Sequence, residues 1–178
     1  MRTIEIRKIG ITELDTDAIV NAANKGLLAG GGVCGAIFRA AGHHQLQEAC
    51  DKIGYCETGS AVITNGFRLK AKYIIHAVGP VWSGGRNREP ELLYSAYYES
   101  LDLAVKHDCR SIAFPLISAG IYGYPLEGAW TQAIHACRDY LDKHPEVSLK
   151  IIFAVLEDRI MEKGYATLIT EAPDYVKI

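Results

Sequence analysis

The stretch that decides the fold reads LLAGGGVCGAIFRAAG and spans residues 27–42. Three consecutive glycines, Gly30 to Gly32, lead into an alanine-rich segment whose apolar residues have helical spacing. Glycine lets backbone N–H groups approach an oxyanion closely, and the start of a helix adds the positive end of its dipole. The stretch therefore predicts an anion-binding turn that opens a helix, with the thiol of Cys34 at the join.

Strand-like apolar runs alternate with helical patterns on both sides of this stretch. Strands are expected at residues 3–9, 17–23, 60–66, 73–80, 111–118 and 149–156. Helices are expected at residues 33–53 with a break at Gly42, and at 89–107, 126–143 and 158–170. Strands that alternate with helices predict a layered α/β fold with a largely parallel sheet. No linker or repeat interrupts this order, so the 178 residues predict a single domain over 1–178.

Composition excludes several classes of protein. Hydrophobic residues make up 49% and charged residues 22%, as in a globular domain, and no apolar run approaches the length of a membrane span. The first residues lack the apolar core of a signal peptide, so we expect a cytoplasmic location and no membrane contact. A net charge of −2 and a pI near 6.3 give no electrostatic reason to expect a nucleic-acid partner.

The cysteines and histidines give no sign of a metal site. The five cysteines are scattered, with no C-x-x-C pair and no zinc-finger spacing, so we expect no metal and no other cofactor. Cys50, Cys109 and Cys137 are interpreted as reduced, packed thiols. The adjacent His43 and His44 are expected on the surface, and the sequence does not place His76 relative to Cys34.

Two loops rich in glycine and small residues follow predicted buried strands, where parallel sheets bind their ligands. The first contains Asn24 and the three glycines, and the second runs from Ser118 to Gly123. Neither has the spacing of a Rossmann or P-loop motif. Two anion-cradling loops predict a ligand with a diphosphate, and the amide of Asn24 suits a sugar hydroxyl or a water. Asn21 is interpreted either as part of an Asx turn or as a further polar group of the site.

Four segments together resemble macrodomains, which are α/β/α modules that bind ADP-ribose. They are DAIVNAAN (17–24), LLAGGGVCGAIFRAAG (27–42), AKYIIHAVGPVW (71–82) and SIAFPLISAGIYGYPLE (111–127). The chain is most similar to the bacterial O-acetyl-ADP-ribose deacetylase group, whose members also release mono-ADP-ribose from acidic side chains. The resemblance implies a three-layer α/β/α sandwich around a mixed, largely parallel six-stranded sheet. It also implies ADP-ribose or a derivative as the ligand, and an ADP-ribosylated protein as a further partner.

The resemblance further implies the residues of the ligand site. Those expected at the adenine end are Gly10, Ile11 and Leu156. Those expected at the distal ribose and on one side of the diphosphate are Ala22, Asn24, Gly31, Gly32, Val33 and Cys34. Those expected on the other side of the diphosphate are Ser118, Ala119, Gly120, Ile121 and Tyr122. Asn24 and Cys34 are the candidate catalytic residues.

This chain departs from the family at both ends of the site. Gly10 stands where the family motif G-D-I-T has an aspartate that accepts a hydrogen bond from adenine, and Leu156 replaces a frequent aromatic residue. Cys34 replaces an aspartate that is proposed to activate or position water, and Phe38 replaces a histidine. A thiol with an ordinary pKa of about 8.5 is mostly protonated at neutral pH. Losing a general base lowers a rate by about 10²- to 10⁴-fold, so we expect weakened hydrolysis.

Several functions stay open at this point. The first is slow hydrolysis of O-acetyl-ADP-ribose or of mono-ADP-ribosyl esters. The second is a non-catalytic module that binds ADP-ribose or another nucleotide, with altered specificity at the adenine end. A third is a regulatory role through protein contacts. A nucleophilic Cys34 thiolate at the helix N-terminus is a further alternative for the chemistry.

Overall fold

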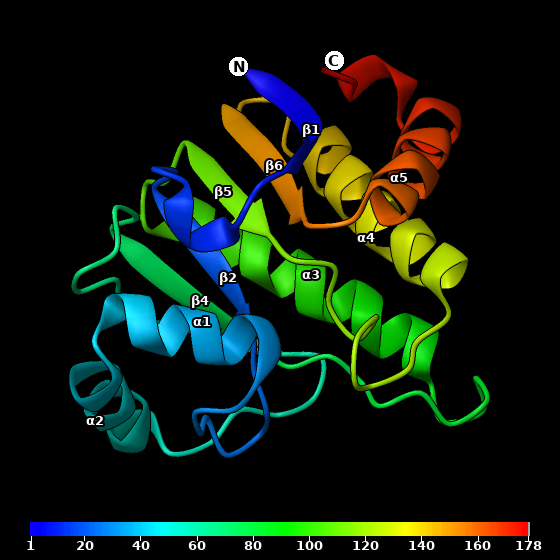
Figure 1. Ribbon diagram of the computed structural model, residues 1–178. Helices are drawn as coiled ribbons and strands as arrows, with labels where there is room; N and C mark the ends of the chain where they lie inside the picture. Colours follow the sequence, from blue (N-terminus) through cyan, green and yellow to red (C-terminus); the bar gives the residue numbers. More distant parts are fainter. Residues whose placement is uncertain (178) are drawn as a thin grey trace.

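The computed structural model describes residues 1–177, and its centre is a six-stranded sheet (Figure 1). The strands are β1 (Arg2–Lys8), β2 (Ala18–Ala22), β3 (Ala61–Asn65), β4 (Tyr73–Ala77), β5 (Ser111–Phe114) and β6 (Leu149–Val155). They pair in the order β1-β6-β5-β2-β4-β3, and β3 is antiparallel to β4 while the other pairings are parallel. The prediction of a mixed, largely parallel sheet is confirmed.

Helices cover both faces of the sheet and complete the three layers (Figure 1). One face carries α1 (Gly32–Ala41) and α2 (His43–Ile53), which are separated at Gly42 as expected. The other face carries α3 (Glu89–Lys106), α4 (Leu126–Lys143) and α5 (Asp158–Glu171). Short 3-10 turns lie at Ile11–Glu13 and Pro173–Tyr175. Among the described residues, no helix combines the length and the apolar character that a membrane crossing requires.

The sheet is buried on both faces because successive residues of a strand point to opposite sides. In β2, Ala18 and Val20 pack toward α3 and α4, whereas Ile19 packs toward α1 and α2. The predicted apolar face of α3 is also confirmed. Its members, all fully buried, are Leu93, Ala96, Tyr97, Leu101 and Ala104.

Two adjacent strands place the candidate loops side by side. β2 and β5 are parallel neighbours, so the chain leaves both of them at the same edge of the sheet. The strand predicted at 111–118 was too long, because β5 ends at Phe114. Pro115 has no N–H to continue the ladder, and Ser118 takes the left-handed conformation with φ 66°. The loop therefore starts earlier than expected and turns over the end of β2.

Candidate ligand-binding cleft

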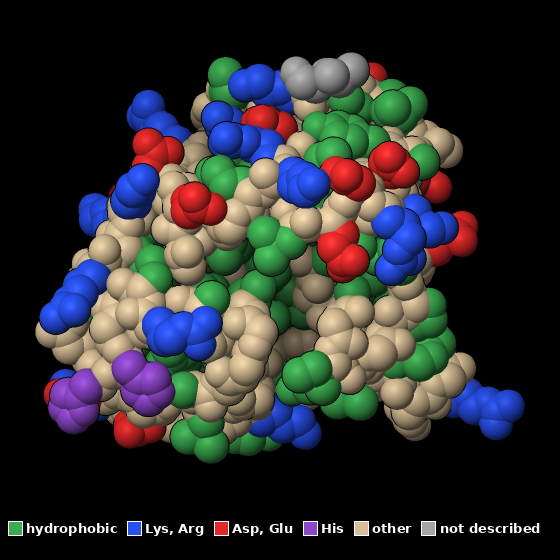
Figure 2. All heavy atoms as spheres, viewed as in Figure 1, with side chains coloured by type: hydrophobic (Ala, Val, Ile, Leu, Met, Phe, Trp, Pro, Cys, Tyr) green, Lys and Arg blue, Asp and Glu red, His purple; other side chains and the backbone are tan. Residues whose placement is uncertain are grey.

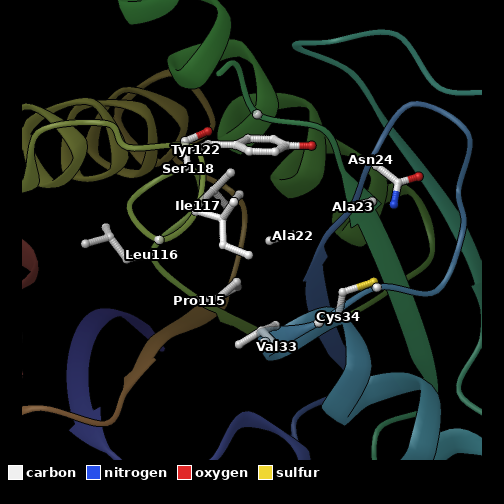
Figure 3. A pocket seen from close by; sticks show the side chains of 16 residues that line it. Ala22, Ala23, Asn24, Val33, Cys34, Pro115, Leu116, Ile117, Ser118 and Tyr122 are labelled. Atoms are coloured by element: carbon white, nitrogen blue, oxygen red, sulfur yellow. The ribbon is translucent and has the colours of Figure 1, made fainter. Parts of the chain in front are cut away.

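A cleft of about 400 Å³ lies at the carboxyl ends of β2 and β5. It appears as the hollow in the middle of the face in Figure 2, where charged side chains gather around it rather than in it. In Figure 3, Cys34 and Val33 face the cleft from the start of α1, and Ile117, Ser118 and Tyr122 face it from the loop after β5. The two loops that the sequence singled out thus form opposite walls of one cleft.

Most of the expected ligand-binding residues line this cleft. They are Ala22, Asn24, Gly31, Gly32, Val33, Cys34, Ser118, Gly120, Ile121 and Tyr122. Gly10, Ile11, Ala119 and Leu156 do not line it. Ile11 is buried in the core under α1, and the side chain of Leu156 is 69% exposed. The cleft therefore brings together the residues expected at the distal ribose and the diphosphate, apart from Ala119, while the residues expected at the adenine lie outside its lining.

The first wall is an uncapped helix N-terminus. Gly31 is the N-cap of α1 and offers no side-chain hydrogen bond to the first turn, and Gly32 has φ 57°. A Cβ added at Gly31 or Gly32 would meet no other atom within 4 Å. The first N–H groups of a helix have no partner within the helix. They are consequently free to donate to an anion in the cleft, with the helix dipole in support.

The second wall is held in place by the segment that follows β4. The Ser118 hydroxyl donates a hydrogen bond to the Pro80 carbonyl at 2.8 Å, and the Trp82 N–H donates to the Tyr122 carbonyl at 2.8 Å. A Cβ at Gly79 would lie 2.3 Å from Ser118 Oγ and 2.5 Å from Ile117 Cγ2. Glycine is therefore required at residue 79 for the two segments to approach this closely.

Asn24 closes the loop that precedes α1. Its Oδ1 accepts the N–H of Leu28 at 2.9 Å, and its Nδ2 donates to the carbonyl of Leu28 at 2.8 Å. The second hydrogen of Nδ2 is not used by these contacts. Asn24 is thus held in one orientation at the cleft wall, and one hydrogen of its Nδ2 stays available for a further acceptor.

Cys34 lies in the first turn of α1, and its side chain is 7% exposed. Its Sγ is 3.7 Å from the Leu28 carbonyl oxygen. Burial raises the pKa of the Cys34 thiol, and hydrogen bonds from the Gly30 backbone and the Asn21 side chain oppose this shift only in part. The thiol is therefore neutral at neutral pH, which argues against a nucleophilic thiolate.

Asn21 and His76 form a buried polar pair behind Cys34. The Asx-turn interpretation of Asn21 was wrong, because Asn21 lies within β2 at a position paired with His76 of β4. Asn21 Nδ2 is 3.0 Å from His76 Nδ1. Burial lowers the pKa of His76 to about 4, so the imidazole is neutral. Sequence reasoning could not place His76 here, because only the register of β2 and β4 joins the two residues.

The expectations for the other histidines and thiols are confirmed. His43 and His44 are exposed, and Cys50, Cys109 and Cys137 are free and buried. No cluster of three or more His, Cys, Asp or Glu side chains that could hold a metal occurs within residues 1–177. The residues that line the cleft, all of them within this range, include no Asp, Glu, His, Lys or Arg. Anion binding in the cleft would therefore rely on backbone N–H groups and the helix dipole.

Sequence reasoning missed Glu13. The N–H of Gly10 donates to Glu13 Oε2 at 3.1 Å, and a Cβ at Gly10 would lie 2.8 Å from the same oxygen. The carboxylate of Glu13 thus occupies the space that a side chain at residue 10 would enter. The three-residue separation of a capping box was the available signal. Gly79, Pro115, Leu116 and Ile117 also line the cleft without having been predicted.

The amino-acid sequence is similar to those of known proteins. The family model for the Macro domain matches residues 20–133. A macro domain-containing protein of Chlorobaculum tepidum is 55% identical over 155 residues, which cover 87% of this chain and 89% of that protein. The chain belongs to the macro domain family. A second relative is a macro domain-containing protein of Listeria monocytogenes, which is 48% identical over 169 residues. The aligned residues cover 93% of this chain and 96% of that protein.

Solved macrodomains also share the fold of this macro domain. The Oceanobacillus iheyensis macrodomain with ADP has a TM-score of 0.87 at 36% identity, covering 93% of this chain and 89% of that one. The Trypanosoma brucei macrodomain in complex with ADP has a TM-score of 0.85 at 38% identity, and the match covers 94% of this chain and 69% of that one. Structures of the Oceanobacillus protein include variants at an asparagine, at a glycine seven positions after it, and at an aspartate three positions after the glycine. Asn24, Gly31 and Cys34 have the same separations here, so the thiol corresponds by spacing to that aspartate.

Proposed function

We propose that this macro domain binds ADP-ribose in the cleft and hydrolyses ADP-ribosyl esters slowly at most. The observation that carries the proposal is the chemistry of the lining, which presents two walls of backbone donors and no carboxylate or imidazole. The glycine variant of the Oceanobacillus macrodomain was solved with ADPR, which supports the same ligand for this chain.

The two walls suit different parts of the ligand. The diphosphate would lie between the N-terminus of α1 and the loop from Ser118 to Tyr122, both of which offer backbone N–H groups. The distal ribose would lie beside Ala22 and Asn24, at the end that Cys34 closes. Ile121 at the cleft wall is 93% exposed, so the cleft opens to the surface. This opening suits ADP-ribose that is attached to a protein as well as the free molecule.

Glu13 would supply the acidic group that Gly10 lacks. Its carboxylate fills the space of the residue-10 side chain and is exposed to solvent. An ionised carboxylate accepts hydrogen bonds from an amino group such as that of adenine. Preference for adenine would thus be retained through a residue three positions further along the chain.

Hydrolysis lacks a base at the cleft wall. A general base must accept a proton near the operating pH, and the raised pKa of the Cys34 thiol leaves it as a neutral, weak acceptor. Asn24 can orient a water but cannot take its proton. We therefore expect this protein to bind ADP-ribose and to hydrolyse ADP-ribosyl esters only slowly.

Calorimetric titration with ADP-ribose, ADP and AMP tests binding. ADP-ribose should bind most tightly, ADP next and AMP least. ADP lacks the distal ribose, and AMP lacks both this ribose and the second phosphate. If ADP-ribose and AMP bind equally, or neither binds at millimolar concentration, the assignment of the cleft is wrong.

A hydrolysis assay tests the role of Cys34. Wild-type protein should release product from O-acetyl-ADP-ribose slowly, and Cys34→Asp should raise the rate by about 10²- to 10⁴-fold. Cys34→Asn is the matched control, because it has the same shape without a basic oxygen. Fast turnover by the wild type, or equal rates for the two variants, would contradict the proposal.

A further inference from the structure

Glu89 is a buried carboxylate that does not line the cleft. It is the first residue of α3, is 1% exposed, and forms no ion pair with a side chain of residues 1–177. Its Oε2 accepts the N–H groups of Ser83 and Gly85, both at 2.9 Å, and the Ser83 hydroxyl at 3.1 Å. Its Oε1 accepts the N–H of Asn87. These donors and the N-terminus of α3 stabilise an ionised carboxylate in the interior.

The donors belong to an irregular segment, residues 80–87, which lies between β4 and α3 and which we call the strap. It contains no helix or strand, and its Gly84 and Gly85 have φ 91° and 84°. A segment of this kind has no backbone ladder to fix its shape, and ordering its glycines costs conformational entropy. The hydrogen bonds to Glu89 therefore determine the conformation of the strap.

The strap in turn contacts the second wall of the cleft at several points. The Trp82 N–H donates to the Tyr122 carbonyl at 2.8 Å, and the Pro80 carbonyl accepts the Ser118 hydroxyl at 2.8 Å. The ring of Trp82 packs against that of Tyr124, with the centroids 4.7 Å apart. Tyr122 and Ser118 both line the cleft. A displacement of the strap would consequently displace this wall.

We propose that Glu89 is a positioning residue for the ligand-binding cleft, because it anchors the strap that holds the second wall. Glu89 touches no cleft residue itself and acts through Pro80 and Trp82. It thereby preorganises the site for the ADP-ribose binding proposed above, on which this role rests. Without the anchor the wall would adopt several arrangements, and the affinity would fall with the fraction of molecules in the binding-competent one.

Glu91 provides a matched control for Glu89. Both carboxylates lie in the first turn of α3, but the side chain of Glu91 is 67% exposed and pairs with Arg88 at 3.0 Å. Glu91→Gln therefore removes the same charge from the same helix end without removing a hydrogen bond of the strap. In Glu89→Gln, by contrast, the new Nε2 hydrogens face at least one N–H of the strap, and the remaining oxygen is a weaker acceptor.

Calorimetric titration with ADP-ribose tests the role of Glu89. At a temperature where all the proteins are fully folded, Glu89→Gln should raise the Kd by about tenfold or more, as when one molecule in ten has a competent wall. Glu91→Gln should stay within about twofold of the wild type, because exposed ion pairs contribute little. A loss of global stability alone would leave the Kd unchanged under these conditions. A wild-type Kd for Glu89→Gln would overturn the proposal.

Hydrogen exchange of the Trp82 N–H tests the anchor without any ligand. NMR-detected exchange at this group should be faster in Glu89→Gln than in the wild type and in Glu91→Gln, relative to the amides of β5. Exchange that rises equally at Trp82 and in β5 would mean global destabilisation only and would overturn the proposal. If the wild type does not bind ADP-ribose, the proposed function fails, whereas this measurement still decides whether Glu89 anchors the strap.

A second pair of variants is available if Glu89→Gln does not fold. A Cβ at Gly85 would lie 3.1 Å from Cη2 of Trp82, whereas a Cβ at Gly84 meets no atom within 4 Å. Both glycines have positive φ, so alanine strains the backbone at either residue. Gly85→Ala also displaces Trp82 and should weaken ADP-ribose binding more than Gly84→Ala does. Equal affinities of the two variants would overturn the role of the strap and, with it, that of Glu89.

Discussion

The close approach of Gly79 to the Ser118 loop allows a quantitative prediction. In Gly79→Ala, the new methyl group would lie 2.5 Å from Ile117 Cγ2 and 2.3 Å from Ser118 Oγ, well inside van der Waals contact. The Ser118 hydroxyl can rotate away, but it then loses its hydrogen bond to the Pro80 carbonyl. Ile117 is 1% exposed, and the free space that its side chain borders is the cleft. The loop after β5 must therefore move away from residue 79.

Two costs add up in this variant. Overpacking of a buried methyl group destabilises a protein by about 1–3 kcal/mol, and a lost hydrogen bond contributes about 1 kcal/mol. The free energy of unfolding should thus fall by about 2–4 kcal/mol, which shifts a urea midpoint by about 1–2 M at a typical m-value. Urea denaturation followed by circular dichroism measures the change, and ADP-ribose titration measures the expected accompanying loss of affinity.

Gly120→Ala is the matched control for this prediction. A Cβ at Gly120 meets no atom within 4 Å, although this residue also lines the cleft. The free energy of unfolding of Gly120→Ala should stay unchanged or rise by up to about 1 kcal/mol, because alanine restricts the conformations of the unfolded chain. If the free energy of unfolding of Gly79→Ala lies within about 0.5 kcal/mol of the wild-type value, the steric reasoning is refuted.

Three further predictions follow from other parts of the structure. Glu13→Gln should weaken ADP-ribose binding by about 2- to 100-fold in calorimetry, the cost of one charge-assisted hydrogen bond, whereas Asp15→Asn at a nearby exposed position should have no effect. Burial alone would raise the pKa of Glu89, but the N–H groups of Ser83, Gly85 and Asn87 lower it from 4.5 to about 2. The stabilisation by this carboxylate is complete above pH 4.5 and is lost as the pH falls toward 2, so acid titration of Glu89→Gln should show a smaller loss of stability over this range than the wild type. ADP-ribose at about 100 times its Kd should stabilise the protein by about 2.7 kcal/mol; a Tm that does not respond to this ligand would refute binding to the native state.

The order and type of the main elements could be predicted because their signals are local. The apolar face of α3, the alternation along β1 and the break at Gly42 each lie within a single segment of sequence. The end of β5 was predicted too late, because Ile117 is apolar and buried like a strand residue although it belongs to a loop. Its burial comes from packing in the core cluster between the sheet and α3 and α4, and from contact with Gly79.

The walls of the cleft could be predicted in part, and the residues behind them could not. Glycine runs and an asparagine after a strand signal backbone exposure, and the family resemblance gave them roles. Gly79 matters through a contact with residues almost forty positions away, and His76 matters through strand register. Such relations arise only once the chain has folded, because nothing in the neighbouring sequence of either residue encodes them.

The bare N-terminus of α1 implies a trade-off between stability and function. A serine at residue 31 would cap the helix and gain a few tenths of a kcal/mol over glycine. Its side chain would then stand in the open space beside Gly31 and compete with a ligand for the same N–H groups. Selection for stability alone would fill this position, whereas selection for anion binding keeps it empty. An anion bound there would supply partners for the first N–H groups of α1, so binding of the proposed ligand would also stabilise the start of the helix.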